Sequence, residues 1–179
     1  RRSFIVGLKS TTLLPKEKFF LLKYMPWGVI LFSRNIKSLS QARKLTDNIR
    51  SIFKDKKYPI LIDEEGGRVT RLKKIVDNSP FSGSFFGKIY VNDKKRFINC
   101  YKIFIDQTSF ILNKIGININ TVPILDVKQK KSNNIIGDRS FSANAKIVSD
   151  IGDYCISNFK KNKIGTVIKH IPGHGLAKV

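Results

Sequence analysis

Continuous apolar runs of strand length alternate with amphipathic segments along this sequence, and that alternation restricts the folds it can adopt. An unbroken apolar run suits a strand that is buried on both faces, as strands in parallel sheets are. Alternation of such strands with helices favours parallel βα units. We predict five strands, at residues 4–6, 28–32 and 58–62, within 117–125, and at 166–168.

The segments between these runs carry helix signals. Pro15 can open a helix, because its fixed φ suits the first helical turn. Ser38 and Gln41 have the spacing of a capping box, and apolar residues recur at helical intervals after them. The same periodicity predicts a long helix at 93–114 and another at 143–161.

The length of the chain limits how much of such a fold it can hold. A complete (β/α)8 TIM barrel needs about 250 residues, and the sequence has 179. We therefore expect an α/β fold with about the first five βα units of a TIM barrel, as one partial domain over residues 1–179 that is truncated at both ends. A doubly wound parallel sheet is the alternative. An open barrel leaves two strand edges unpaired, so we expect the isolated chain to fold poorly.

Polar residues follow the carboxyl ends of the predicted strands. They are Ser33–Asn35, Asp63–Arg68, Asp126 and Lys169–His170. In a parallel barrel these ends lie at one mouth, where the βα loops form the binding site. The sequence therefore predicts a polar pocket that suits a ligand with many hydroxyl groups.

The acidic triplet Asp63–Glu65 could indicate a pair of catalytic carboxylates, as in glycosidases. Consecutive residues of an extended chain cannot all face one point, however. We expect one of the three to face the pocket and the others to pair with Arg68 or Arg71. The two glycines that follow the triplet permit a backbone turn. A solvated turn is the alternative.

The only two histidines, His170 and His174, lie near the end of the sequence. Their spacing is found in metal sites on helices, but Pro172 opposes a helix there. We therefore interpret Lys169 and His170 as hydrogen-bond donors to ligand hydroxyls. His174 could brace the loop or contact the ligand directly.

Arg139 ends a basic, polar loop at residues 128–139. Its guanidinium has a rigid fork of donors that could reach a sugar. The alternative is a surface ion pair with Asp138 or Asp126, and the sequence leaves both interpretations open.

A formal net charge of +21 could indicate a nucleic-acid partner. The basic residues are scattered in short clusters on predicted helix surfaces and loops, which argues against such a partner; steep salt dependence of DNA binding would favour it. The chain has no apolar stretch of about 18 residues, so no transmembrane helix is predicted. We interpret the two cysteines, Cys100 and Cys155, as small core residues in a reducing compartment.

Taken together, these segments resemble glycoside hydrolase family 3, and within it the bacterial β-N-acetylglucosaminidase (β-N-acetylhexosaminidase) branch, which recycles cell-wall fragments. The matching stretches occur in the family's order and cover nearly the whole chain. They are Gly28–Asn35, Asp63–Arg71, Pro123–Asp126, Ile136–Ser142 and Lys169–Gly175. Glu64 and Ile171 depart from the family pattern, in which Gln and Phe are usual at these positions.

The resemblance implies a cytoplasmic enzyme that hydrolyses terminal β-linked N-acetylglucosamine from glycosides or peptidoglycan fragments. It implies a retaining mechanism, no metal or organic cofactor, and no nucleic-acid or membrane partner. The residues it implies for binding the N-acetylglucosaminyl unit are Asp63, Arg71, Arg139, Lys169 and His170. The family's acid/base histidine and aspartate nucleophile would lie beyond Val179, so we expect no catalytic residue within the chain and no activity from it alone. A non-catalytic sugar-binding remnant of the same fold is the alternative.

Overall fold

The computed structural model describes residues 2–129 and 134–175, and its centre is a single parallel sheet. Its strands are β1 (Arg2–Gly7), β2 (Pro26–Leu31), β3 (Ile60–Ile62), β4 (Ile119–Asn120) and β5 (Gly165–Thr166). Each strand pairs in parallel with the next one along the chain. This consecutive order has no reversal point, which a doubly wound sheet requires. The sheet therefore has the order of a barrel, as predicted.

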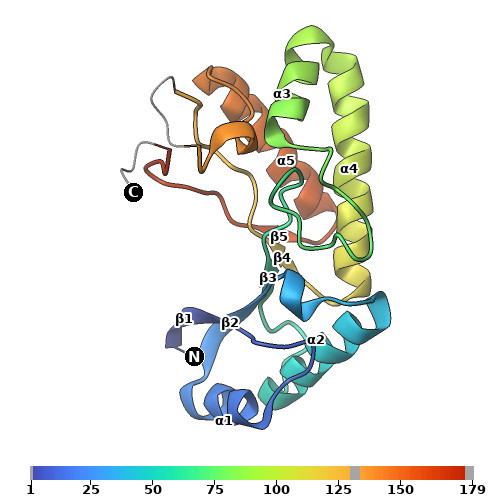
Figure 1. The fold of residues 1–179 in the computed structure, drawn as a ribbon, viewed down its shortest axis with the longest axis vertical. Coiled ribbons are helices and arrows are strands. Elements are labelled where there is room, and N and C mark those ends of the chain that lie inside the picture. The colour runs from blue at the N-terminus through green and yellow to red at the C-terminus, as the bar shows by residue number, and fades with distance from the viewer. Residues whose placement is uncertain (1, 130–133, 176–179) are drawn as a thin grey trace.

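Helices fill the connections between the strands. They are α1 (Pro15–Tyr24), α2 (Leu39–Phe53), α3 (Gly83–Asn92), α4 (Lys94–Lys114) and α5 (Ala145–Lys161), with short 3-10 helices η1 (Ser33–Asn35) and η2 (Gly137–Arg139). Figure 1 shows the strands running through the middle of the molecule, with α2 and α4 along one side. β1 and β5 form the two edges of the sheet and do not pair with each other. The fold is therefore a partial, open barrel, as the strand count predicted.

The helix predictions at residues 93–114 and 143–161 are confirmed: α4 and α5 begin within two residues of the predicted N-terminal ends and end where predicted. At α2, Ser38 Oγ accepts the Gln41 N–H at 3.3 Å, but Gln41 Oε1 accepts from Lys37 N at 2.7 Å rather than from Ser38. The first bond of the predicted capping box is therefore present, whereas the second involves the backbone of Lys37 in place of that of Ser38.

α3 has no counterpart among the predicted helices. Gly83 and Gly87 lower its intrinsic helix propensity, and the structure shows why both positions need glycine. A Cβ on Gly87 would lie 1.7 Å from the carbonyl oxygen of Phe141, and a Cβ on Gly83 would lie 2.1 Å from that of Arg139. α3 therefore packs directly against the backbone that carries Arg139.

The apolar core lies between the sheet and the helices. In register, Val29 of β2 pairs with Ile60 of β3, and Leu31 with Ile62, and all four side chains are fully buried. Burial of such side chains contributes about 1.5–3 kcal/mol each. Towards α3 and α4 the core is aromatic, with ring contacts among Phe86, Phe97, Tyr101 and Phe104. This packing fixes the strand ends from which the polar residues project.

Both cysteines are unpaired, and Cys155 is buried in the core. In the described part of the chain, no helix combines the length and the apolar character that a membrane span needs. Residues 130–133 of the predicted basic loop, with part of its lysine cluster, lie outside the described residues, as do residues 176–179.

Candidate functional site

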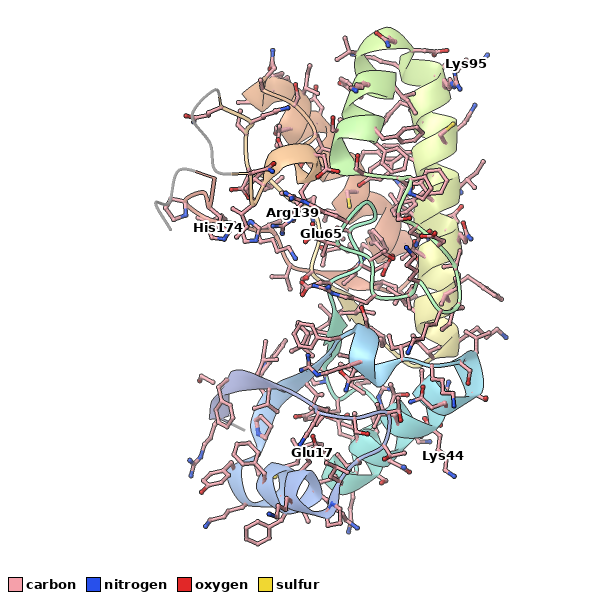
Figure 2. The ribbon with its side chains drawn as sticks, in the orientation of Figure 1. Glu17, Lys44, Glu65, Lys95, Arg139 and His174 are labelled. Atoms are coloured by element: carbon pink, nitrogen blue, oxygen red, sulfur yellow. The ribbon has the colours of Figure 1, made fainter. Side chains whose placement is uncertain are left out.

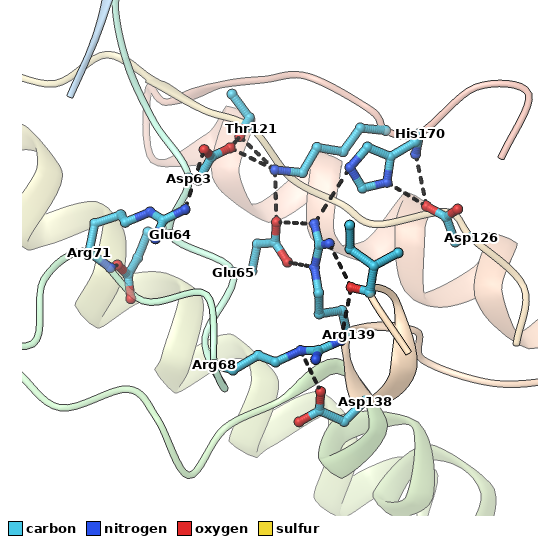
Figure 3. A network of polar contacts seen from close by, with 12 residues as sticks. Asp63, Glu64, Glu65, Arg68, Arg71, Thr121, Asp126, Asp138, Arg139 and His170 are labelled. Atoms are coloured by element: carbon cyan, nitrogen blue, oxygen red, sulfur yellow. Dashed lines mark hydrogen bonds and ion pairs between the residues drawn. The ribbon is translucent and has the colours of Figure 1, made fainter. Parts of the chain in front are cut away.

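Lys169, which follows β5, is the meeting point of three strand ends. Its ammonium Nζ lies 2.7 Å from Oδ1 of Asp63, 3.0 Å from Oγ1 of Thr121 and 2.8 Å from Oε1 of Glu65 (Figure 3). Thr121 also donates its hydroxyl to Asp63. Parallel strands bring these residues together because their carboxyl ends share one edge of the sheet. The predicted convergence of side chains from separate strands is confirmed for Asp63 and Lys169.

Arg139, on η2, makes a two-pronged ion pair with Glu65. Arg139 Nε lies 2.9 Å from Oε2 of Glu65, and Nη2 lies 2.9 Å from Oε1. The side chains of Arg139 and Glu65 are only 11% and 5% exposed. Figure 2 places them beside each other, away from Lys44 and Lys95 on the outer surface. The predicted alternative for Arg139, an ion pair with Asp138 or Asp126, is wrong.

Asp63 and Arg139 both have shifted pKa values. Burial raises the pKa of Asp63, but the hydrogen bonds from Lys169 and Thr121 and the positive charges of Lys169 and Arg71 outweigh it, and the net shift is downward. Burial lowers the pKa of Arg139, but the hydrogen bond to Glu65 and its charge reverse the shift. Both groups are therefore held in their charged forms.

Asp126, after β4, gathers the segment that contains both histidines. Its Oδ2 accepts the backbone N–H of His170 at 3.0 Å and lies 2.7 Å from Nδ1 of the same residue. Its Oδ1 accepts the backbone N–H of His174 at 2.6 Å. Burial raises the pKa of Asp126, but these hydrogen bonds bring it below its ordinary value, so the group is a carboxylate. Nδ1 of His170 must then carry the hydrogen, since a carboxylate can only accept.

The ring of His170 is consequently oriented with Nε2 towards Arg139, whose Nη2 lies 3.5 Å away. His174 contributes its backbone N–H to the Asp126 carboxylate, which favours the loop-brace interpretation of this residue. The two imidazole rings are 5.2 Å apart and tilted. Within the described residues, no group of three or more His, Cys, Asp or Glu side chains could hold a metal ion.

Glu64 is fully buried, and within the described residues its hydrogen-bond donors include no cationic side chain. Its carboxylate accepts the Thr70 hydroxyl at 2.7 Å, the Asn78 side-chain amide at 2.9 Å, and two backbone N–H groups, those of Arg71 at 2.6 Å and Leu72 at 3.0 Å. Burial raises the pKa of Glu64 despite these four bonds. The carboxylate therefore fixes the backbone of the loop that presents Arg71.

The Arg71 side chain lies at the rim of the network. Its Nη2 is 3.8 Å from Oδ2 of Asp63, and its guanidinium lies over the ring of Phe32, 5.7 Å from the centroid. Arg68 pairs with Asp138 at 3.1 Å. Of the acidic triplet, only Asp63 lies beside one of the two arginines, Arg71. The prediction that two of the three pair with Arg68 or Arg71 is therefore wrong, because Glu64 and Glu65 turn inward to other partners.

The structure thus brings together all five predicted residues, Asp63, Arg71, Arg139, Lys169 and His170. Three further members of the network, Glu65, Thr121 and Asp126, are not among these five. Position in the sequence placed Glu65 and Asp126 at strand ends without indicating their partners, and nothing in the sequence indicated Thr121. Glu65 had a usable signal, since it lies two residues after Asp63 and residues at that spacing in an extended chain point the same way. The site offers alternating acceptors and donors, which suits the hydroxyl groups of a polyol or sugar.

A partial, open βα barrel with charged residues gathered at the carboxyl ends of its parallel strands defines part of a TIM-barrel domain with a polar ligand site. The model of the glycosyl hydrolase family 3 N terminal domain matches residues 11–179. The chain therefore belongs to glycoside hydrolase family 3, as the sequence motifs predicted.

Known proteins with similar sequences include beta-hexosaminidases. The chain is 34% identical over 171 residues to the beta-hexosaminidase of Hydrogenovibrio crunogenus, covering 96% of this chain and 47% of that protein. It is 32% identical to beta-hexosaminidase A of Pseudoalteromonas piscicida, covering 92% of this chain and 28% of that protein. The chain thus spans about half or less of the length of these relatives.

Solved structures show the same fold. NagZ from Neisseria gonorrhoeae superposes with a TM-score of 0.87 at 26% identity, over 98% of this chain and 51% of that protein. A glycoside hydrolase family 3 beta-N-acetylglucosaminidase from Paenibacillus sp. superposes with a TM-score of 0.82 at 28% identity, over 96% of this chain and 32% of that protein.

Proposed function

We propose that this chain is the N-terminal, sugar-binding part of an enzyme that hydrolyses terminal β-linked N-acetylglucosamine. The convergence of Asp63, Arg71, Arg139, Lys169 and His170 in one polar network carries this proposal. A NagZ structure from Neisseria gonorrhoeae in complex with N-trifluoroacetyl-D-glucosamine supports the choice of ligand. The preferred substrates in this proposal are peptidoglycan fragments with a terminal N-acetylglucosamine.

Asp63 and Arg71 form the most accessible polar pair for the sugar. In the described part of the chain, Oδ2 of Asp63 accepts no hydrogen bond and lies 3.8 Å from Nη2 of Arg71. The side chains of Asp63 and Arg71 are 19% and 27% exposed, although the Nε of Arg71 is itself buried. An ionised carboxylate can accept from one sugar hydroxyl, while the guanidinium beside it donates to the neighbouring hydroxyl. Arg139 and Lys169 lie deeper in the network. Each would contact the sugar by redirecting to it an N–H group that donates to a protein acceptor in the free site.

The chemistry itself requires groups that the family places elsewhere. We propose that the acid/base histidine and the aspartate nucleophile of a retaining mechanism come from residues after Val179. In a retaining reaction the nucleophile forms a glycosyl–enzyme intermediate that water then hydrolyses. The residues described here would hold the sugar while those groups act.

The test is hydrolysis of a chromogenic β-N-acetylglucosaminide, with the matching β-glucoside as the comparison substrate, by the longer protein that carries this chain. Asp63→Asn removes a charged acceptor, which costs about 1.5–3 kcal/mol and predicts a loss of roughly 10- to 100-fold in kcat/KM. Asp47→Asn, at an exposed ion pair with Arg43 on α2, is the matched control.

Selective cleavage of the N-acetylglucosaminide, sensitive to Asp63→Asn and not to Asp47→Asn, is the expected result. Binding of N-acetylglucosamine by a folded protein without hydrolysis would instead identify a non-catalytic sugar-binding remnant. A folded protein that neither binds nor cleaves would reject the proposal.

A further inference from the structure

Glu65 lies at the centre of the network although it was not among the predicted site residues. Its Oε1 lies 2.8 Å from Lys169 Nζ and 2.9 Å from Arg139 Nη2, and its Oε2 lies 2.9 Å from Arg139 Nε (Figure 3). With a side chain only 5% exposed, Glu65 offers a ligand very little surface. One buried carboxylate therefore holds both cations of the inner site.

The donor count shows how completely the two cations are fixed. An ammonium has three N–H donors, and Lys169 has three acceptors within 3.0 Å, on Asp63, Thr121 and Glu65. A guanidinium has five N–H donors. Four of those of Arg139 are directed at Glu65, the Ile135 carbonyl and His170. Little freedom of rotation remains in either side chain.

Removal of Glu65 would leave the two cations without their shared anion. Lys169 is 16% exposed and Arg139 11% exposed, so neither can recover its lost bonds from bulk water without moving. Asp63 would be the nearest remaining carboxylate for Lys169. Arg139 would lose both bonds of its ion pair and Lys169 would lose one of its three acceptors, so both cations would be held less tightly than in the intact site.

We infer that Glu65 is a positioning residue of the sugar site, which never touches the ligand and fixes Arg139 and Lys169 where the ligand meets them. This inference rests on the proposed function for the identity of the ligand, whereas the arrangement of the cations does not depend on it. Residues that hydrogen-bond to ligand-contacting side chains hold those side chains in the geometry that binding requires.

The side chain of glutamate is specifically required. Glutamine in its place has one acceptor oxygen and an amide that donates, and that amide would face the donors of Arg139. Aspartate keeps the charge but is one methylene shorter, so it cannot span both cations. Glu65→Gln and Glu65→Asp therefore disturb the same arrangement by different routes.

The first measurement is made without ligand on the longer protein. An amine-reactive ester labels lysines, and mass spectrometry follows each site. We expect Lys169 to be labelled at least about tenfold faster in Glu65→Gln than in the parent, with the other lysines unchanged, since roughly 1.4 kcal/mol of lost interaction corresponds to tenfold. Asp47→Asn, with labelling and thermal unfolding like the parent, is the control.

The second measurement is the affinity for N-acetylglucosamine by calorimetry. We expect Glu65→Gln to weaken binding by roughly 10- to 100-fold. If Glu65 acts through Arg139, the double variant with Arg139→Lys should be about as weak as the weaker single variant. Additive losses would instead show that Glu65 and Arg139 contribute to affinity independently.

The outcomes separate the two proposals. Unchanged labelling of Lys169 in a folded Glu65 variant overturns the inference, as does full affinity for N-acetylglucosamine in a variant whose Lys169 is released. Faster labelling in a protein whose parent form binds no N-acetylglucosamine rejects the proposed function and retains Glu65 as the anchor of the two cations. If Glu65→Gln does not fold, Glu65→Asp supplies the same comparison.

Discussion

The Asp126 carboxylate makes the most quantitative prediction, because one side chain holds the 170–175 segment through N–H donors on both oxygens. Oδ2 takes the backbone N–H and the ring Nδ1 of His170, and Oδ1 takes the backbone N–H groups of His174 and, at 3.3 Å, Gly175. Asp126→Asn keeps the shape but only one acceptor oxygen, so the bonds on the other are lost whichever way the amide turns.

The size of the effect follows from those bonds. A hydrogen bond to a charged group contributes about 1.5–3 kcal/mol, so the loss of two weakens the closed segment by about 3 kcal/mol at the lower end. Because 1.4 kcal/mol corresponds to a factor of ten, the amides of residues 170–175 should exchange with solvent roughly 100-fold faster. Hydrogen exchange read by mass spectrometry measures this local opening directly.

The pH dependence supplies a second, independent check. The pKa of Asp126 is lower in the folded protein than in the unfolded chain, where it is about 3.9. Its contribution to stability is therefore present above the unfolded value and is lost as pH falls through the folded value. Asp126→Asn should show no such acid-induced opening of the segment. Unchanged exchange at residues 170–175 in the variant, relative to the Asp47→Asn control, would refute this account of the clamp.

Three further predictions test the packing, a buried charge and the open sheet. Gly87→Ala would place a Cβ 1.7 Å from the Phe141 carbonyl oxygen; overpacking of this kind costs about 1–3 kcal/mol or more, so the melting temperature should fall by several degrees, whereas Lys88→Ala on the exposed side of α3 should not change it. Because burial raises the pKa of Glu64, its favourable contribution is complete below the unfolded value of about 4.3 and is lost as pH rises through the folded value. As the pH rises from 4 to 7, the free energy of unfolding of Glu64→Gln, measured in urea, should therefore increase relative to that of the parent. A relative decrease over that range would show that the sign is wrong. The isolated 179-residue chain should aggregate on size-exclusion chromatography, because both edges of the sheet are unpaired; a monomer with a cooperative melting transition would contradict this.

Much of the fold was predictable from local signals. The apolar runs gave the positions of the strands because parallel strands that are buried on both faces consist mostly of apolar residues. Helical periodicity gave α2, α4 and α5, whose apolar faces pack on the sheet. α3 was not predictable in this way, because Gly83 and Gly87 serve a tertiary approach to the 139–141 backbone and not the helix itself.

The candidate site divides in the same manner. The sequence by itself determined which residues reach the mouth of the barrel, because position at the end of a strand is a local property: Asp63, Lys169 and His170 all follow apolar runs. Only the tertiary structure decided which charges pair. Glu65 meets Arg139 across 74 positions of sequence, and Asp126 meets His170 across 44. Electrostatic pairing depends on separation in space and on exclusion of water, and both are set by how the strands and helices pack.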